Sequence, residues 1–292
     1  MMTKIYGLLN YCYEDCKDDQ VPGIELQLFL IAVKSLLPYE DKIGCLFDVK
    51  RYEREIQLFK YYKNGNDDSI EYYYENKKPS KNEDRLLEFK IIPVIVANTQ
   101  WDNLINEALR AAIFYSVNKN TILDTIIIAS AVDEYLSTST KDMGKISELA
   151  KERLINFSIK EFLNSNNIEL NKESLIGFEK ERINMLSNME LMYNLKNKYK
   201  SLNYIYKEQK TDKSEINGNT VLSSFSLYLS KLRQGVIGPE RLKVPQGNIP
   251  ELREFLKHSS FVHPLLGRCK IIKRGVKEVI IKNKTGIIKV NI

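Results

Sequence analysis

Hydrophobic and polar residues alternate along most of the chain with the spacing of α-helices. Glu25–Leu37 is apolar on nearly every side and ends at Pro38, which predicts a helix in a core rather than on a surface. Trp101–Tyr115 has apolar residues three and four positions apart, and the apolar stretch Ile122–Leu136 follows after a short polar break. Two apolar helices joined by so short a break predict a helical hairpin at the centre of the protein.

Most of the chain up to about residue 260 has the same character. The stretch Lys63–Asn82 is polar and predicts an exposed excursion. Further helices are predicted at residues 47–62, 146–163, 172–204, 219–232 and 251–257. The fold class that follows is mainly α.

The period of the pattern changes at the C-terminus. Cys269–Lys273, Val276–Lys282 and Gly286–Ile292 are β-branched runs separated by short turns. They predict a three-stranded antiparallel β-meander. We therefore expect two parts, a helical domain over residues 1–265 and a basic β appendage over residues 266–292.

Composition limits the fold and the class of protein. The chain has 292 residues, of which 43% are hydrophobic, with 17 Tyr and 11 Phe, enough for one sizeable core. Only 13 Gly and 8 Pro argue against a barrel, sandwich or propeller, which would need more turns. A mainly helical fold agrees with both observations.

Positive charge gathers in the appendage. The net charge is +6, but residues 266–292 hold eight basic side chains against one acid, Glu278, so the rest of the chain sums to −1. The eight are Arg268, Lys270, Lys273, Arg274, Lys277, Lys282, Lys284 and Lys289. Such a surface can bind nucleic acid through counterion release, bind a protein, or protect a strand edge or contact in a homo-oligomer.

Cysteine and histidine are too few and too dispersed for a metal site. Cys12 and Cys16 have helical spacing, but no second Cys/His pair lies at the separation of a zinc site. The first residues do not form a signal peptide, and no apolar run reaches the length that spans a membrane. We expect a cytoplasmic protein with free thiols and no membrane association.

Common catalytic motifs are missing from the sequence. It has no Gly-rich phosphate loop and no Gly-x-Ser-x-Gly elbow, and two histidines leave almost no scope for a Ser-His-Asp triad. Glu14, Asp15, Asp18 and Asp19 precede the apolar helix, where they either hold a hard cation or form a solvated turn. Asn217-Gly218-Asn219-Thr220 opens a late helix, as a cap or as an anion site.

The order of these elements resembles the ADP-ribosylglycohydrolase family. Its Gly-Gly-Asp-Thr-Asp-Thr motif falls on residues 217–222, where Gly218 and Thr220 are kept but Asn219 and Val221 replace the two Asp. Its Thr/Ser-His-x-Asp motif falls on Ser116-Val117-Asn118-Lys119. Its Thr-Asp-Asp-Thr motif falls on residues 21–24 or, with an insertion, on Lys17-Asp18-Asp19-Gln20.

The resemblance implies an orthogonal multi-helix bundle with a cleft that holds two Mg²⁺ and removes ADP-ribose. The substitutions remove carboxylates that two Mg²⁺ need, so the first hypothesis is a pseudoenzyme with no metal or other cofactor, which binds a protein or a nucleotide-like ligand. Its candidate ligand-binding residues are Asn118, Asn217, Gly218, Asn219 and Thr220. The alternatives are an active, Mg²⁺-dependent hydrolase using Asp18 and Asp19, and a nucleic-acid- or protein-binding module led by the basic tail.

Overall fold

Helices form most of the structure, and a small antiparallel sheet forms its C-terminal part. The computed structural model describes residues 1–14, 20–138, 142–188, 190–208, 220–239 and 251–291. The helices there are α1 Met2–Cys12, α2 Ile24–Lys34, α3 Val49–Phe59, α4 Asp68–Asn76, α5 Leu87–Ala97, α6 Trp101–Ile113, α7 Lys119–Ser137, α8 Met143–Asn156, α9 Ile159–Ser165, α10 Lys172–Ser187, α11 Leu191–Lys198, α12 Lys200–Glu208, α13 Val221–Arg233 and α14 Leu252–Phe255. The strands are β1 Leu36–Pro38, β2 Cys45–Phe47, β3 Ser260–His263, β4 Gly267–Arg274, β5 Glu278–Asn283 and β6 Gly286–Asn291.

The core is built around α2, α5 and α7. Every residue of α5 is buried, and so are Leu26–Val33 of α2 and most of α7. Ile126 and Ile128 are fully buried, which confirms the sequence prediction that α7 lies at the centre. α6 and α7 pack together as the predicted hairpin.

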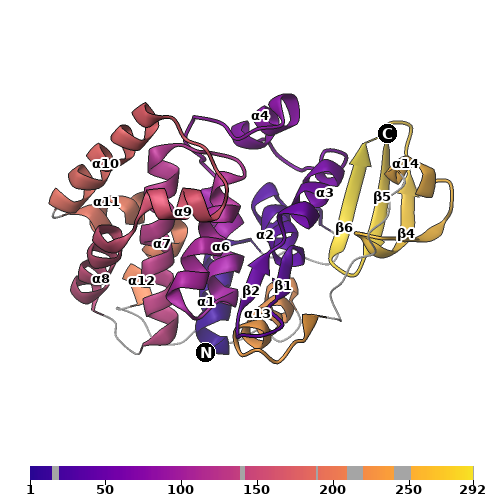
Figure 1. The fold of residues 1–292 in the computed structure, drawn as a ribbon. Coiled ribbons are helices and arrows are strands. Elements are labelled where there is room, and N and C mark those ends of the chain that lie inside the picture. Colours follow the sequence, from indigo (N-terminus) through magenta and orange to yellow (C-terminus); the bar gives the residue numbers. More distant parts are fainter. Residues whose placement is uncertain (15–19, 139–141, 189, 209–219, 240–250, 292) are drawn as a thin grey trace.

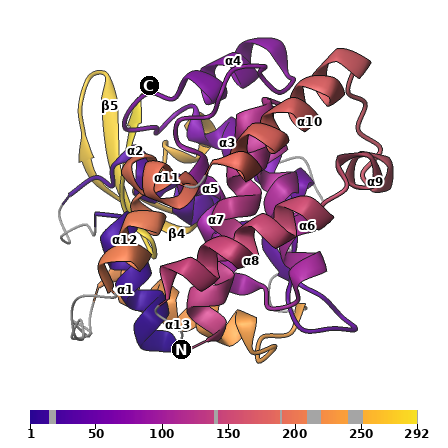
Figure 2. The ribbon, with the colours of Figure 1, turned by 90° about the vertical axis from the view of Figure 1, so that its left-hand side faces the viewer.

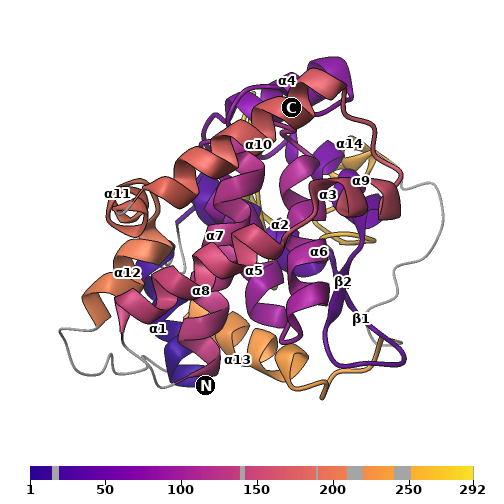
Figure 3. The same ribbon diagram turned by 60° about the vertical axis from the view of Figure 1, so that its left-hand side comes forward.

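The remaining helices surround this core. α8, α10 and α12 pack on α7 at the end of the molecule opposite the C-terminal sheet (Figures 1 and 2). α13 runs beside α1 at the lower end of the molecule (Figure 3) and also packs on α5. None of the helices in the described ranges is both long and apolar enough to cross a membrane.

Three helix predictions need correction. The helix expected over Glu25–Leu37 ends at Lys34, because Leu36–Pro38 instead pairs with β2 as a short hairpin. The stretch expected as one or two helices over residues 172–204 is divided into α10, α11 and α12. The polar stretch Lys63–Asn82 contains α4, whose N-cap Asp67 is buried rather than exposed.

The predicted C-terminal meander is present and has one strand more than expected. The sheet order is β3-β4-β5-β6 with every neighbouring pair antiparallel. β3 lies ahead of residue 266, so the sheet begins within the segment that the sequence assigned to the helical part. Alternation predicts one buried face, and Phe261, Cys269, Val279, Ile281 and Val290 are buried on it.

Candidate functional site

Two of the residues selected from the motifs serve as helix caps. The Asn118 side-chain oxygen accepts a hydrogen bond from the Asn120 N–H at 2.9 Å, and its amide nitrogen donates to the Lys81 carbonyl at 2.8 Å. Thr220 caps α13 and forms a capping box with Ser223. The other candidates, Asp18, Asp19, Asn217, Gly218 and Asn219, lie outside the described residues.

A polar cluster lies at the N-terminal end of α7, one turn beyond Asn118. Lys198, at the end of α11, places its ammonium against Glu83 and 2.6 Å from Oδ2 of Asp124. The Tyr199 hydroxyl donates to the same Oδ2 at 2.6 Å, and the Asn120 amide reaches Glu83 at 3.4 Å. We call these five residues the Lys198 cluster.

Burial dominates the electrostatics of this cluster. The Asp124 side chain is only 1% exposed, and its burial raises the pKa of the carboxyl group, although Lys198 opposes that change. Burial alone would lower the pKa of Lys198, but Asp124 and Glu83 outweigh it and raise that pKa above its ordinary value. Lys198 is therefore held as an ammonium between two carboxyl groups.

A second lysine bridges two carboxylates deeper in the core. The Lys90 side chain on α5 is fully buried, and its ammonium lies 2.8 Å from both oxygens of Asp84 and 3.2 Å from Asp67. It also lies 4.1 Å from the centroid of the Tyr115 ring, a cation–π distance. The arrangement ties α4, through its cap Asp67, to the central helix α5.

α5 also carries a buried acid, Glu88, which caps another helix. Glu88 accepts hydrogen bonds at 2.9 Å from the backbone N–H groups of Lys200 and Ser201, which begin α12, and from the Ser201 hydroxyl. Sequence reasoning missed Glu88 and Lys90. The signal was two charged residues inside the apolar run Leu87–Ala97, which requires partners in the core.

The described residues do not fit a two-magnesium centre. The motif positions Asn118 and Thr220 contribute no carboxylate and are occupied as caps. Asp124, the first carboxylate along α7, and Glu83, which precedes α5, both face the Lys198 ammonium instead of an open position. Within the described ranges, no three His, Cys, Asp or Glu side chains are grouped so that they could hold a metal ion.

The outward face of the C-terminal sheet carries a group of cations. Residues paired across an antiparallel ladder point to the same face. Lys270 pairs with Lys282, and Arg268 lies two residues before Lys270 on β4. Across β5, Ile280 pairs with both Lys273 and Lys289. We call this set the basic face; its members are Arg268, Lys270, Lys273, Lys282 and Lys289, all exposed.

A β-bulge in β4 places Lys273 on the basic face. Strict alternation from Lys270 would turn Lys273 to the buried side of the sheet. The register shifts between Ile271 and Lys273, so Lys273 joins the outward face and Ile272 is the extra residue. The other cations of the tail are also exposed: Arg274 at the end of β4, and Lys277 and Lys284 in the turns.

The basic face has few compensating acids. Glu278 pairs with Lys289, and no ion pair joins Arg268, Lys270, Lys273 or Lys282 to an acid in the described part of the chain. Lys270 lies directly opposite Lys282, a like-charge pair that destabilises a sheet unless an anion lies nearby. The basic face therefore carries a clear excess of positive charge, with five cations against one acid.

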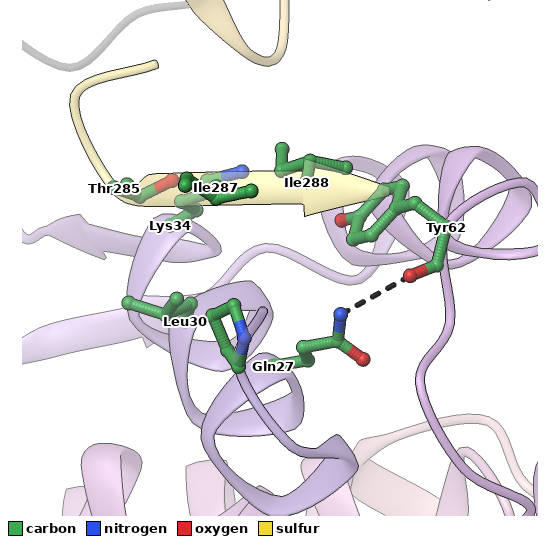
Figure 4. A pocket seen from close by; sticks show the side chains of 8 residues that line it. Gln27, Leu30, Lys34, Tyr62, Thr285, Ile287 and Ile288 are labelled. Carbon is green, nitrogen blue, oxygen red and sulfur yellow. Dashed lines mark hydrogen bonds between the residues drawn. The ribbon is translucent and has the colours of Figure 1, made fainter. Parts of the chain in front are cut away.

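The seam between the sheet and the helices is tightly closed. The Asn291 N–H donates to the Tyr61 carbonyl at 3.0 Å, and Ile287 and Ile288 of β6 line a crevice together with residues of α2. A crevice at this seam, shown in Figure 4, has a volume of about 20 Å³, room for roughly one water molecule. It is too small for a substrate, and Gln27 beside it is bonded to the Tyr62 carbonyl.

The cysteines of the described chain are free and buried, as expected. They are Cys12, Cys45 and Cys269, and burial is the main cause that raises the pKa of each thiol. Cys16 lies outside the described residues. These thiols are not activated nucleophiles.

Comparison of the chain with protein-family models, with curated proteins and with solved structures finds no match. The resemblance to ADP-ribosylglycohydrolases therefore stays a prediction from the sequence.

Proposed function

We propose that this chain is a binding protein that holds double-stranded nucleic acid by its phosphate backbone on the basic face. The observation that carries the proposal is the single-sided display of five exposed cations on one small sheet, with one paired acid. Neutralising phosphates releases condensed counterions, which drives association without reading the base sequence.

The side chains between the cations favour backbone contact over base contact. Val262 and Ile280 share the face, and none of its outward positions is aromatic. Binding of single strands usually depends on aromatic residues that stack on bases. A stiff duplex presents phosphates without that requirement, so we propose a duplex as the ligand.

We further propose that the helical body is an orthogonal bundle related to ADP-ribosylglycohydrolases but without their hydrolysis. Two observations support this: the described motif positions Asn118 and Thr220 act as caps, and Lys198 lies between Glu83 and Asp124. In this proposal the body positions the sheet and takes no part in chemistry. Incubation with ADP-ribosylated protein and Mg²⁺ tests this part, because Mg²⁺-dependent release of ADP-ribose would refute it.

Fluorescence anisotropy with a labelled duplex at 50 and 200 mM salt tests the nucleic-acid proposal. With five phosphate contacts, affinity should fall about 500-fold between the two salt concentrations, whereas one contact gives about a 3.5-fold loss. The variant Arg268→Gln/Lys270→Gln/Lys273→Gln/Lys282→Gln should lose most of the affinity and most of this salt dependence. DNA and RNA duplexes of unrelated sequence should bind the wild type within a few-fold of one another.

A charge-matched control separates the basic face from net charge. Lys50, Lys60, Lys145 and Lys180 are exposed on the helical body, and their fourfold change to Gln removes the same charge. This control should keep the salt dependence of the wild type. Equal losses in both variants, or no binding by the wild type at 50 mM salt, would refute the proposal.

A further inference from the structure

Outside the basic face, the Lys198 cluster is a polar site that is partly open to solvent. It brings Glu83 and Asp124 to one ammonium, the Tyr199 hydroxyl donates to Asp124, and the Asn120 amide nitrogen donates to Glu83. The Lys198 side chain is 38% exposed, so the ammonium comes from the rim while Asp124 forms the buried floor.

Two oxygens of this site have no hydrogen-bond partner. They are Oδ1 of Asp124 and Oδ1 of Asn120, both shielded from solvent. Asn120 and Asp124 are four residues apart on α7, so their side chains lie on the same helix face. A buried acceptor without a donor costs free energy of folding, and one of these two acceptors belongs to the Asp124 carboxylate, which is 99% buried.

We propose that the Lys198 cluster is a cation site in which an internal ammonium takes the place of a divalent metal ion. Glu83 and Asp124 are the ligands, and the ion that they suit is Mg²⁺ or Mn²⁺. The site uses residues of α7 and the segment before α5, and it does not depend on the binding of nucleic acid.

The donor set accounts for the choice of ion. Mg²⁺ takes oxygen ligands and keeps several of its waters, so one or two carboxylates are enough to hold it. Mn²⁺ shares this preference for carboxylate and carbonyl oxygen. Lys198 contacts Glu83 and Asp124 at once, which places oxygens of both carboxylates around a single point.

Neutral substitution of Lys198 tests the inference directly. In Lys198→Met the apolar stem is kept and the charge is lost, so Glu83 and Asp124 face each other without a cation. Titration with Mn²⁺, followed by electron paramagnetic resonance, should show a site at least about tenfold tighter in Lys198→Met than in the wild type. Mn²⁺ should also raise the melting temperature of this variant more than that of the wild type.

Two further variants control the result. Lys200→Met removes a lysine two residues away whose pair with Glu25 is exposed, and it should bind Mn²⁺ no better than the wild type. Lys198→Met/Asp124→Asn should lose the gained site. Equal Mn²⁺ binding by Lys198→Met and the wild type, or the same gain in Lys200→Met, would overturn the inference.

Folding of the variants gives an equally clear outcome. Lys198→Gln keeps a polar side chain and serves as a second neutral form, with folding followed by circular dichroism. If either neutral variant unfolds without metal, recovery of its helical signal on adding Mn²⁺ supports the cation site. Failure of Mn²⁺ to restore the signal contradicts it.

Discussion

Removal of the buried ammonium at Lys90 should be among the most destabilising single changes in this chain. Lys90→Met keeps nearly the same volume and the same unbranched stem, but leaves Asp67 and Asp84 without the cation between them. All three side chains are at least 98% buried, so water cannot take the place of the ammonium. The change also removes the cation from the Tyr115 ring.

The expected loss follows from that burial. Removing one partner of a buried ion pair costs about 3–5 kcal/mol, because a charge remains in a medium that solvates it poorly. The exposed pair Lys200–Glu25 is the natural comparison, since pairs of that kind contribute about 0–1 kcal/mol. Urea unfolding of Lys90→Met, Lys200→Met and the wild type at pH 7, followed by circular dichroism, measures the difference.

The dependence on pH gives an independent check. Burial raises the pKa of Asp84 even with Lys90 present to oppose it, so without Lys90 the pKa of this carboxyl rises further. A carboxyl group with a higher pKa in the folded state binds its proton first in that state, and stability is gained as pH falls through that pKa. The deficit of Lys90→Met should therefore be smaller at pH 5 than at pH 7.

Restoring charge balance should recover part of the loss. In Lys90→Met/Asp67→Asn/Asp84→Asn all three charges of this cluster are removed, so this variant should be more stable than Lys90→Met at pH 7. A cost below about 1 kcal/mol for Lys90→Met would refute the reasoning. So would a deficit that does not change between pH 7 and pH 5.

Two further predictions concern single positions. Burial, followed by the nearby charge of Lys34, lowers the pKa of His263 to about 4. The NMR signals of its imidazole should therefore not change between about pH 8 and pH 5.5. The stability of the protein should fall as the pH drops from about 6.5 toward 4, because the unfolded state takes up the proton first. A midpoint near 6.5 would contradict this. Gly44→Ala should lower stability by about 1–3 kcal/mol in thermal unfolding, because Gly44 has φ +125° and a Cβ there would lie 2.6 Å from Oδ1 of Asn98; an unchanged melting temperature would contradict it.

The central helix α5 is not among the helices predicted from the sequence. The run Ile91–Ala97 is apolar, but Pro93 within it disfavours a helix at that point. In the structure Pro93 lies near the middle of α5, whose residues are all buried. Packing on α2, α6 and α7 stabilises the helix beyond what local propensity provides.

Long-range pairing also explains why the polar clusters were missed. Asp124 and Lys198 are 74 residues apart, and Lys90 lies 23 residues from Asp67. No spacing rule links such positions, because only the folded core brings the helices together. Glu88 and Lys90 lie inside an apolar run, which indicates that each needs a polar partner in the core. The sequence does not indicate which residues those partners are.

The sequence by itself determined the features that depend on local pattern: the mainly helical body, the burial of α2 and α7, and a β-meander rich in lysine at the C-terminus. Each follows from hydrophobic period and turn residues within a few positions of one another. The tertiary structure alone decided which charges share a face and which carboxylates meet an ammonium. The bulge at Ile272 turns Lys273 outward, and the packing of α12 on α7 brings Lys198, at the end of α11, onto Asp124. The physical reason is that register and packing bring distant residues into contact, whereas local periodicity fixes only the side of an element to which each residue belongs.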